Sequence, residues 1–133
     1  MPKIHHLPVQ IYYEDTDHSG AVYYANYLKY FERAREMVLG VERLVDLWEN
    51  HQIGFAVYKV QVTYLESAKF GDALEVQTWT EMDGDYRIIW HQDIWQKDGS
   101  KAMIKGLVEL VCLKKGQLMA IPDEIIQALH FAK

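Results

Sequence analysis

Residues 24–39 are the one long stretch of helical periodicity in the chain, and apolar side chains occur on most sides of it. Leu28 and Phe31 recur at helical spacing on one side, and Tyr27 and Tyr30 on another. A helix that is apolar nearly all round must be buried. The remaining elements of the chain are therefore expected to enclose this helix.

The rest of the sequence is mostly strand-like. A shorter helix is expected over residues 41–50, after a helix stop at Gly40, and Pro122 is expected to open a last short helix. Runs rich in β-formers predict strands over residues 9–13, 54–66, 73–82, 86–96 and 101–113.

Two features refine the strands. Asp83-Gly84 and Asp98-Gly99 separate the last three strands, and an Asp-Gly pair between alternating runs is a strong hairpin signal because the turn needs φ > 0. These strands should form an antiparallel meander. In the strand over residues 54–66, alternation predicts one shared face for the residues Ala56, Tyr58, Val60, Val62 and Tyr64.

The predicted architecture is a single α+β domain over residues 1–133. An antiparallel sheet of about five strands can bury one face, and one long helix is available to cover it. A sheet wrapped around that helix satisfies both elements. The free sheet edges then need a partner, so we expect at least a dimer of identical chains, and a tetramer as the full assembly.

Composition excludes several classes of function. The formal charge of −5 argues against a nucleic-acid-binding protein, which needs a basic surface. Cys112 is the only cysteine and lies in an apolar strand-like run, so it is interpreted as a buried, unreactive thiol. The N-terminal residues show no apolar stretch of signal-peptide length, and no run approaches a membrane span. These observations predict a cytoplasmic protein without stable membrane insertion.

The densest polar segment, residues 13–20, lies between the first strand and the buried helix, and it allows three interpretations. A calcium loop of the EF-hand type fails, because Asn26 stands where the bidentate Glu is required. Ordinary turn chemistry is the second, since Asp, Ser and Gly often cap a loop backbone. Catalysis is the third: a carboxylate beside a helix N-terminus stays ionised, and the free N–H groups there stabilise a developing oxyanion.

The segment from Tyr12 to Arg35, YYEDTDHSGAVYYANYLKYFERAR, closely resembles the signature of the 4-hydroxybenzoyl-CoA thioesterase-like hotdog family, and most of all its YbgC-type acyl-CoA thioesterases. The order of predicted elements is similar over nearly the whole chain. The resemblance implies a hotdog fold, hydrolysis of acyl-CoA to free acid and coenzyme A, and active sites at a subunit interface. It favours catalysis over turn chemistry for the polar segment.

The resemblance also implies site residues. Asp17 matches the catalytic carboxylate, and the backbone N–H of Tyr24 matches the donor that polarises the thioester carbonyl. His18, Gly20 and Val22 are the candidate substrate-binding residues. Asp15 is interpreted as a structural partner of the loop. Asp17 can act as a nucleophile that forms a mixed anhydride or as a general base toward water, and both roles remain open.

Other chemistry finds little support in the sequence. No serine lies in a Gly-x-Ser-x-Gly motif, and no phosphate-binding glycine motif occurs. The histidines show no metal spacing beyond His5-His6, at a terminus expected to be frayed, so neither metal nor cofactor is expected. Hydrolysis of acyl groups from acyl carrier protein is the second candidate function. An interaction subunit of envelope or lipid-synthesis machinery is the third.

Overall fold

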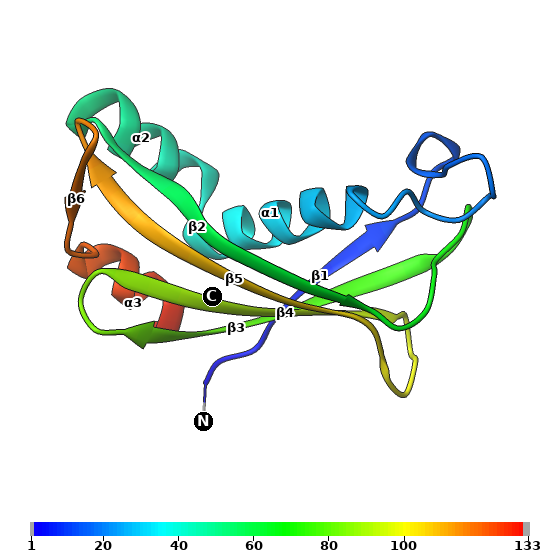
Figure 1. The fold of residues 1–133 in the computed structure, drawn as a ribbon. Coiled ribbons are helices and arrows are strands. Elements are labelled where there is room, and N and C mark those ends of the chain that lie inside the picture. The colour runs from blue at the N-terminus through cyan, green and yellow to red at the C-terminus, as the bar shows by residue number, and fades with distance from the viewer. Residues whose placement is uncertain (1, 132–133) are drawn as a thin grey trace.

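A curved antiparallel sheet, with the long helix α1 lying along its concave side, forms most of the structure (Figure 1). The computed structural model describes residues 2–131. The elements are β1 (His5–Gln10), the 3-10 turn η1 (Tyr13–Asp15), α1 (Asn26–Leu39), α2 (Val41–His51), β2 (Ile53–Tyr64), β3 (Ala73–Asp83), β4 (Arg87–Gln96), β5 (Ala102–Lys114), β6 (Gln117–Met119) and α3 (Asp123–Phe131).

The strand order is β1-β3-β4-β5-β2, and every neighbouring pair is antiparallel. The predicted meander of the last three long strands is confirmed as β3-β4-β5. The short strand β6, which was not predicted, pairs only with the end of β5. β1 and β2 are therefore the two edge strands of the sheet, and β2 is the longer of them.

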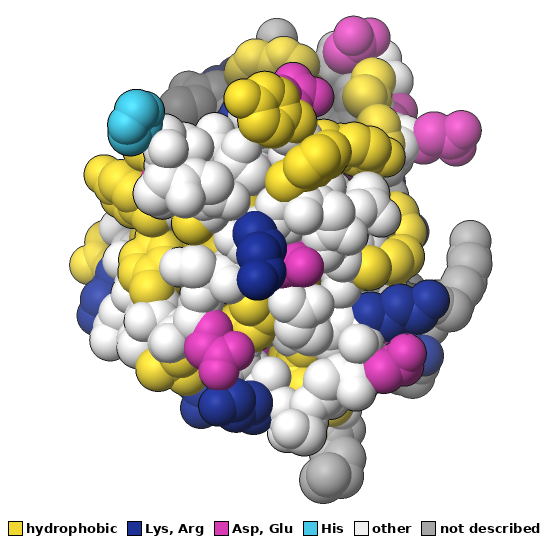
Figure 2. Space-filling view, turned by 90° about the vertical axis from the view of Figure 1, so that its right-hand side faces the viewer, with side chains coloured by type: hydrophobic (Ala, Val, Ile, Leu, Met, Phe, Trp, Pro, Cys, Tyr) yellow, Lys and Arg dark blue, Asp and Glu magenta, His cyan; other side chains and the backbone are white. Residues whose placement is uncertain are grey.

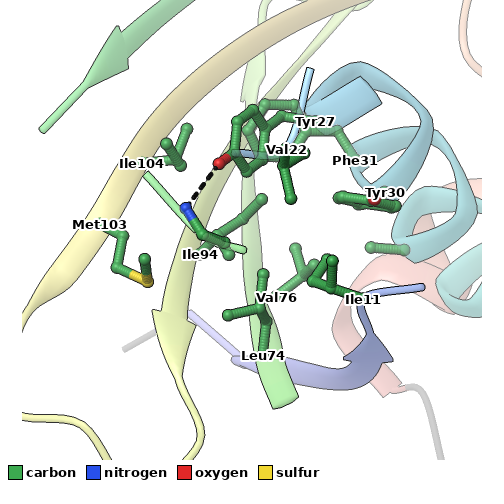
Figure 3. Close-up of a cluster of buried hydrophobic side chains, with 12 residues drawn as sticks. Ile11, Val22, Tyr27, Tyr30, Phe31, Leu74, Val76, Ile94, Met103 and Ile104 are labelled. Carbon is green, nitrogen blue, oxygen red and sulfur yellow. Dashed lines mark hydrogen bonds between the residues drawn. The ribbon is translucent and has the colours of Figure 1, made fainter. Parts of the chain in front are cut away.

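The predicted central helix is confirmed, and its apolar sides account for the core. Tyr27, Tyr30, Phe31 and Ala34 are buried against the sheet in one cluster (Figure 3). A second cluster continues from the C-terminal end of α1 to α2 and α3. Phe31 packs so closely on β5 that a Cβ added at Gly106 would lie 2.6 Å from the Phe31 ring. The helix therefore needs a glycine beneath it in the central part of the sheet.

The first strand differs from its prediction over residues 9–13. β1 begins at His5 and ends at Gln10, and the chain turns immediately afterwards. The expectation of a frayed terminus at His5-His6 is wrong, because both residues pair with β3, His5 with Thr78 and His6 with Gln77. Pro8 is tolerated inside β1 because an edge strand can leave one side of its backbone unpaired.

The predicted face of the strand over residues 54–66 is only half right. A bulge between Val57 and Lys59 inserts an extra residue, Tyr58, opposite β5. Val60 still shares the inner face of β5 with Val108, but before the bulge it is Val57 rather than Tyr58 that faces inward, opposite Leu110. The irregularity reverses the alternation within a single strand, which a strict period of two misses.

Both Asp-Gly hairpins are confirmed, but they use their glycines differently. Gly84 has φ of 69°, as expected for a turn that needs a left-handed residue. In the second hairpin the left-handed residue is Asp98, with φ of 61°. A Cβ at Gly99 would instead lie 2.9 Å from the Gln96 carbonyl oxygen. The glycine is therefore required there by a close backbone approach.

The predicted burial of the single cysteine is confirmed. Cys112 is a free thiol in the core, and burial raises its pKa to about 11, so it stays protonated and unreactive at neutral pH.

No helix within residues 2–131 combines the length and apolar character needed to span a membrane.

Candidate active site

The polar segment folds into a tight hairpin that projects ahead of α1. Thr16 and Val22 form an antiparallel bridge, and the Asp17 N–H donates to the Ala21 carbonyl at 2.8 Å. The Gly20 N–H returns to the Asp17 carbonyl at 3.1 Å, with Gly20 at φ of 88°. This left-handed conformation suits glycine and places Asp17 at the start of the turn.

The carboxylate of Asp17 is exposed and is held on one side only. Its Oδ1 accepts a hydrogen bond from the Ser19 hydroxyl at 2.6 Å and another from the Ser19 N–H at 2.8 Å. The Ser19 hydroxyl contributes most to lowering the pKa of Asp17, followed by the Ser19 N–H. The nearby Ala21 N–H lowers this pKa further, but no hydrogen bond of ordinary geometry from the described residues reaches Oδ2. The loop thus fixes an ionised carboxylate and leaves one oxygen open to solvent.

The start of α1 supplies unpaired backbone donors beside this hairpin. Ala25 is the N-cap and offers no side-chain cap, and the first turn contains no acidic residue. Within the described residues, the N–H of Tyr24 has no acceptor, whereas its carbonyl accepts from the Tyr64 hydroxyl at 3.2 Å. Uncapped N–H groups at a helix N-terminus favour negative charge. The Tyr24 N–H is therefore free to bind an oxygen that becomes anionic.

Asp15 ties the hairpin to the helix. Its Oδ2 accepts from the Tyr12 N–H at 2.7 Å. Its carbonyl accepts from the Tyr23 N–H at 2.9 Å and from the Asn26 side-chain amide at 2.9 Å. These bonds join the strand end, the hairpin and the first residue of α1, and Asp17 takes no share in them. They are consistent with the structural role expected for Asp15.

The candidate substrate-binding residues have different surroundings. His18 is exposed at the hairpin tip, and the Gly20 backbone is exposed beside it. Val22 is only 4% exposed, and its side chain packs into the core cluster beneath α1. Its N–H donates to the Ala68 carbonyl at 2.8 Å. Of the three, His18 and Gly20 can meet a substrate directly, and Val22 anchors the hairpin.

Ala68 braces the hairpin from behind. Its carbonyl binds Val22, and its buried N–H donates to the Tyr27 hydroxyl at 3.0 Å, a bond drawn as the dashed line in Figure 3. Burial raises the pKa of Tyr27, so the hydroxyl stays neutral and available as an acceptor. The first turn of α1 and the hairpin are thereby both bound to one buried residue, Ala68.

We expect Tyr27→Phe to lower the free energy of unfolding by about 1–3 kcal/mol, because the buried Ala68 N–H loses its acceptor. Tyr30→Phe is the comparison: Tyr30 lies one turn along on the same helix, is equally buried, and its hydroxyl makes no hydrogen bond of ordinary geometry among the described residues. Burial, and then the nearby Asp15 carboxylate, raise the pKa of Tyr30, so the hydroxyl has only this weak polar contact to lose. That substitution should cost clearly less than Tyr27→Phe. Urea unfolding measures both, and equal losses would contradict this account of the brace.

Aromatic side chains surround the site. The Tyr24 ring lies 5.0 Å from that of Tyr23 and 6.1 Å from that of Tyr64, and Tyr13 meets Phe70 edge-on at 5.8 Å. Tyr13 is 77% exposed and Phe70 60%. Figure 2 shows this end of the molecule, where hydrophobic side chains gather on the surface. Such an exposed apolar patch marks a surface that contacts a ligand or another chain.

A groove runs between α1 and β2. It contains two cavities, of about 210 and 250 Å³, which share Glu32, Arg35 and Val57 in their linings. Leu28 and Val60 line the end nearer the start of α1, and the remaining walls are mainly apolar. A larger cavity of about 520 Å³ lies at the opposite end of α1, and its lining includes no residue of the hairpin. No hairpin residue lines the groove either, but the groove comes closer to the site, because Leu28 at its end lies one turn after Tyr24.

In the part of the chain that the structure describes, no group of three or more His, Cys, Asp or Glu side chains is arranged to hold a metal ion. His6 bonds Glu75 at 3.1 Å on the exposed side of β1. His91 lies in β4, within the strand predicted over residues 86–96, where it stacks on Trp79 and bonds Glu81 at 2.9 Å.

Comparison with known proteins decides the family. Residues 12–129 match the model of the thioesterase-like superfamily. The acyl-CoA thioesterase YbgC of Haemophilus influenzae is 34% identical over 131 residues, which cover 96% of this chain and 95% of that protein. The chain belongs to the thioesterase-like superfamily. The predicted family resemblance is confirmed, and so is the predicted class of enzyme, a thioester hydrolase.

Solved structures agree on the fold. A 1,4-dihydroxy-2-naphthoyl-CoA thioesterase from Synechocystis superposes with a TM-score of 0.87 at 20% identity, over 96% of each chain. A probable thioesterase from Bartonella henselae gives a TM-score of 0.81 at 25% identity, over 90% of this chain and 100% of that one. The predicted hotdog arrangement within the superfamily is thereby confirmed.

Sequence reasoning missed the parts of the site that come from distant strands. Tyr64 and Phe70 reach it only because β2 ends beside the start of α1 and the connection to β3 folds over the hairpin. Ser19 was within the signature, and its spacing of two from Asp17 is a known signal for a side-chain turn. That signal could have identified it.

Proposed function

We propose that this chain hydrolyses acyl-CoA to free acid and coenzyme A, with Asp17 as the catalytic carboxylate and the Tyr24 N–H as the donor to the thioester carbonyl. The observation that carries the proposal is the contrast at Asp17: Ser19 holds Oδ1, and Oδ2 is open. The adjoining start of α1 has no side-chain cap. A carboxylate and an oxyanion donor are thus offered on one exposed surface.

Thioester hydrolysis needs few catalytic groups beyond a carboxylate and an oxyanion donor. A thiol pKa is about 8.5, so the thiolate leaves readily without a strong general acid. Oδ2 of Asp17 can attack the carbonyl carbon to give a mixed anhydride, which water then cleaves, or it can deprotonate a water that attacks directly. In either route the Tyr24 N–H stabilises the negative charge that develops on the carbonyl oxygen. His18 and Gly20 flank the reacting group.

The pH dependence follows from the Ser19 contacts. Because they lower the pKa of Asp17, the active carboxylate persists below the ordinary range, and activity is lost only as the pH falls through the lowered value. Ser19→Ala removes the largest contribution. We expect its acid limb of kcat/KM to move upward, toward the ordinary value of about 3.9. The pH profile of kcat/KM, measured after brief exposure of the enzyme to each pH, checks this prediction. An acid limb that stays in place in Ser19→Ala would show that ionisation of Asp17 does not control the acid limb.

Assembly into a dimer belongs to the proposal. β2 is a long edge strand with large exposed apolar side chains, Val57, Tyr58 and Val60 among them. Such an edge favours pairing with another strand. Pairing with β2 of a second copy would continue the sheet and close the groove between α1 and β2. Light scattering should give at least the dimer mass at micromolar concentration, and a stable monomer would contradict this part.

We further propose that dimers pair through the outer face of the sheet into a tetramer. Trp79, His91 and Trp95 are half-buried there, on neighbouring strands β3 and β4. Aromatic side chains of this kind are enriched in interfaces between subunits.

Acyl carrier protein remains the second candidate carrier, and a protein-interaction subunit the third role. Comparing thiol release from acyl-CoA with release from the matching acyl-acyl carrier protein separates the first two. Hydrolysis of the carrier-protein substrate alone would promote the second.

A further inference from the structure

Arg35 is a positive charge buried between α1 and the sheet. Its side chain leaves α1 toward the sheet and is only 8% exposed. One guanidinium nitrogen donates to the Gln92 amide oxygen at 3.0 Å, and among the described residues no carboxylate forms an ion pair with it. Burial lowers the pKa of Arg35, and the carboxylates of Glu32 and Glu36 on the same helix offset part of that shift. A charge taken out of water in this way is costly unless an opposite charge reaches it.

The guanidinium is not sealed in by its own chain. Arg35 lines both cavities of the groove between α1 and β2, so its remaining donors have an open approach from that side. Apolar side chains beside it are unusually exposed, Val57 at 51% and Val60 at 42%. A buried charge beside exposed apolar side chains is typical of an interface core from which the partner chain has been removed.

A matching negative charge, Glu32, already acts on Arg35 from the same helix, but among the described residues the two form no ion pair. Glu32 stands one turn before Arg35 on α1, is exposed, and lines both cavities. An ion pair between positions i and i+3 is common on a helix, yet the described residues contain none between these two. Glu36 is a weaker candidate because it lines only one of the cavities.

Twofold symmetry makes these two charges complementary between copies. β2 spans Ile53–Tyr64, so full antiparallel pairing with a second β2 places the axis beside Tyr58 and Lys59. Val57 and Val60, on either side of that point, line the same cavity as Glu32 and Arg35. In such an interface, if residue i of one copy meets j of the other, j also meets i.

We propose that in the edge-to-edge dimer Glu32 of each copy pairs with Arg35 of the partner subunit, so that two identical ion pairs flank the axis and fix the register of β2. The inference rests on the proposed dimer and names its recognition element.

The test uses complementary charge reversal. Glu32→Arg and Arg35→Glu each place like charges together twice in a homodimer, and each should raise the dimer dissociation constant by roughly 100-fold or more. A mixed dimer contains one Glu32→Arg chain and one Arg35→Glu chain. In it, the arginine introduced in one chain meets the glutamate introduced in the other, and the native Arg35 meets the native Glu32. This heterodimer should therefore form with near wild-type affinity. Analytical ultracentrifugation of each variant, the mixture and the wild type measures this, with circular dichroism checking the fold.

A matched control and a second variant keep the test decisive. Glu49→Arg makes the same charge change on an exposed position of α2 that does not line the groove, and it should leave the dimer intact. If Arg35→Glu fails to fold, Glu32→Arg alone must dissociate, and added salt must partly restore its dimer by screening the repulsion.

A Glu32→Arg homodimer as tight as wild type, or folded variants that do not recover on mixing, would overturn the ion pair while leaving the proposed function standing. A monomeric wild type would overturn the dimer as well. Thiol release by the wild type is measured separately, so loss of hydrolysis is distinguished from either result.

Discussion

Asp17→Asn is expected to lower kcat by at least about 100-fold, with a smaller change in KM. An amide can serve neither as nucleophile nor as general base, so both possible mechanisms fail together. The fold of the hairpin should survive, because the Asn side-chain oxygen can still accept the two hydrogen bonds from Ser19. Steady-state thiol release gives the rates, and urea unfolding should show little change in stability.

Asp15→Asn is the comparison within the same loop. The Asp15 carboxylate accepts from the Tyr12 N–H, a bond that an amide oxygen can retain, and it makes no contact with Asp17. We therefore expect a modest loss of activity that follows any loss of stability. If Asp17→Asn kept near-normal turnover while Asp15→Asn were inactive, the assignment within the Asp-x-Asp pair would be wrong.

Gly106→Ala is expected to lower the free energy of unfolding by about 1–3 kcal/mol, the usual cost of overpacking a core. The added Cβ would lie 2.6 Å from the Phe31 ring and 3.0 Å from the Gln92 carbonyl oxygen, both buried. Removing a glycine restricts the unfolded chain and favours folding by about 0.4–1 kcal/mol, which is too little to offset the clash. Urea unfolding of the variant measures the balance.

Gly54→Ala provides the matched control in another strand. Its Cβ would meet Trp48 at 3.5 Å, an ordinary contact, so stability should be unchanged or slightly higher. Phe31→Leu, which shortens the side chain that Gly106 accommodates, should make Gly106→Ala less harmful than it is in the wild-type background. Additive losses in the double variant would show that the Phe31 contact is not the source of the cost.

The sequence predicted the main architecture because its signals were local and strong. The apolar sides of α1 required an enclosing sheet, and the Asp-Gly pairs at residues 83–84 and 98–99 marked the hairpins of the meander. The signature around Asp17 identified the family because it combines a loop and a helix start in one segment. Each of these features depends on residues close together in the chain.

The remaining features depend on pairing between distant segments. The bulge at Tyr58 is set by the register between β2 and β5, and no residue of β2 alone indicates it. The pairing of His5 and His6 depends on β3. Val22 lies in the sequence signature like Asp17, but its burial is fixed by Ala68. Arg35 belongs to a run of helix charges, and only its burial and its bond to Gln92 of β4 distinguish it from a solvated side chain.

Release of coenzyme A from a panel of acyl-CoAs, followed with a thiol reagent, tests the central claim most directly. The purified chain is expected to hydrolyse at least one short, long or aromatic acyl-CoA, and Asp17→Asn prepared in parallel is expected to lose that activity while keeping its fold. No thiol release from any member of the panel, or equal release by the wild type and the Asp17→Asn variant, would contradict the account.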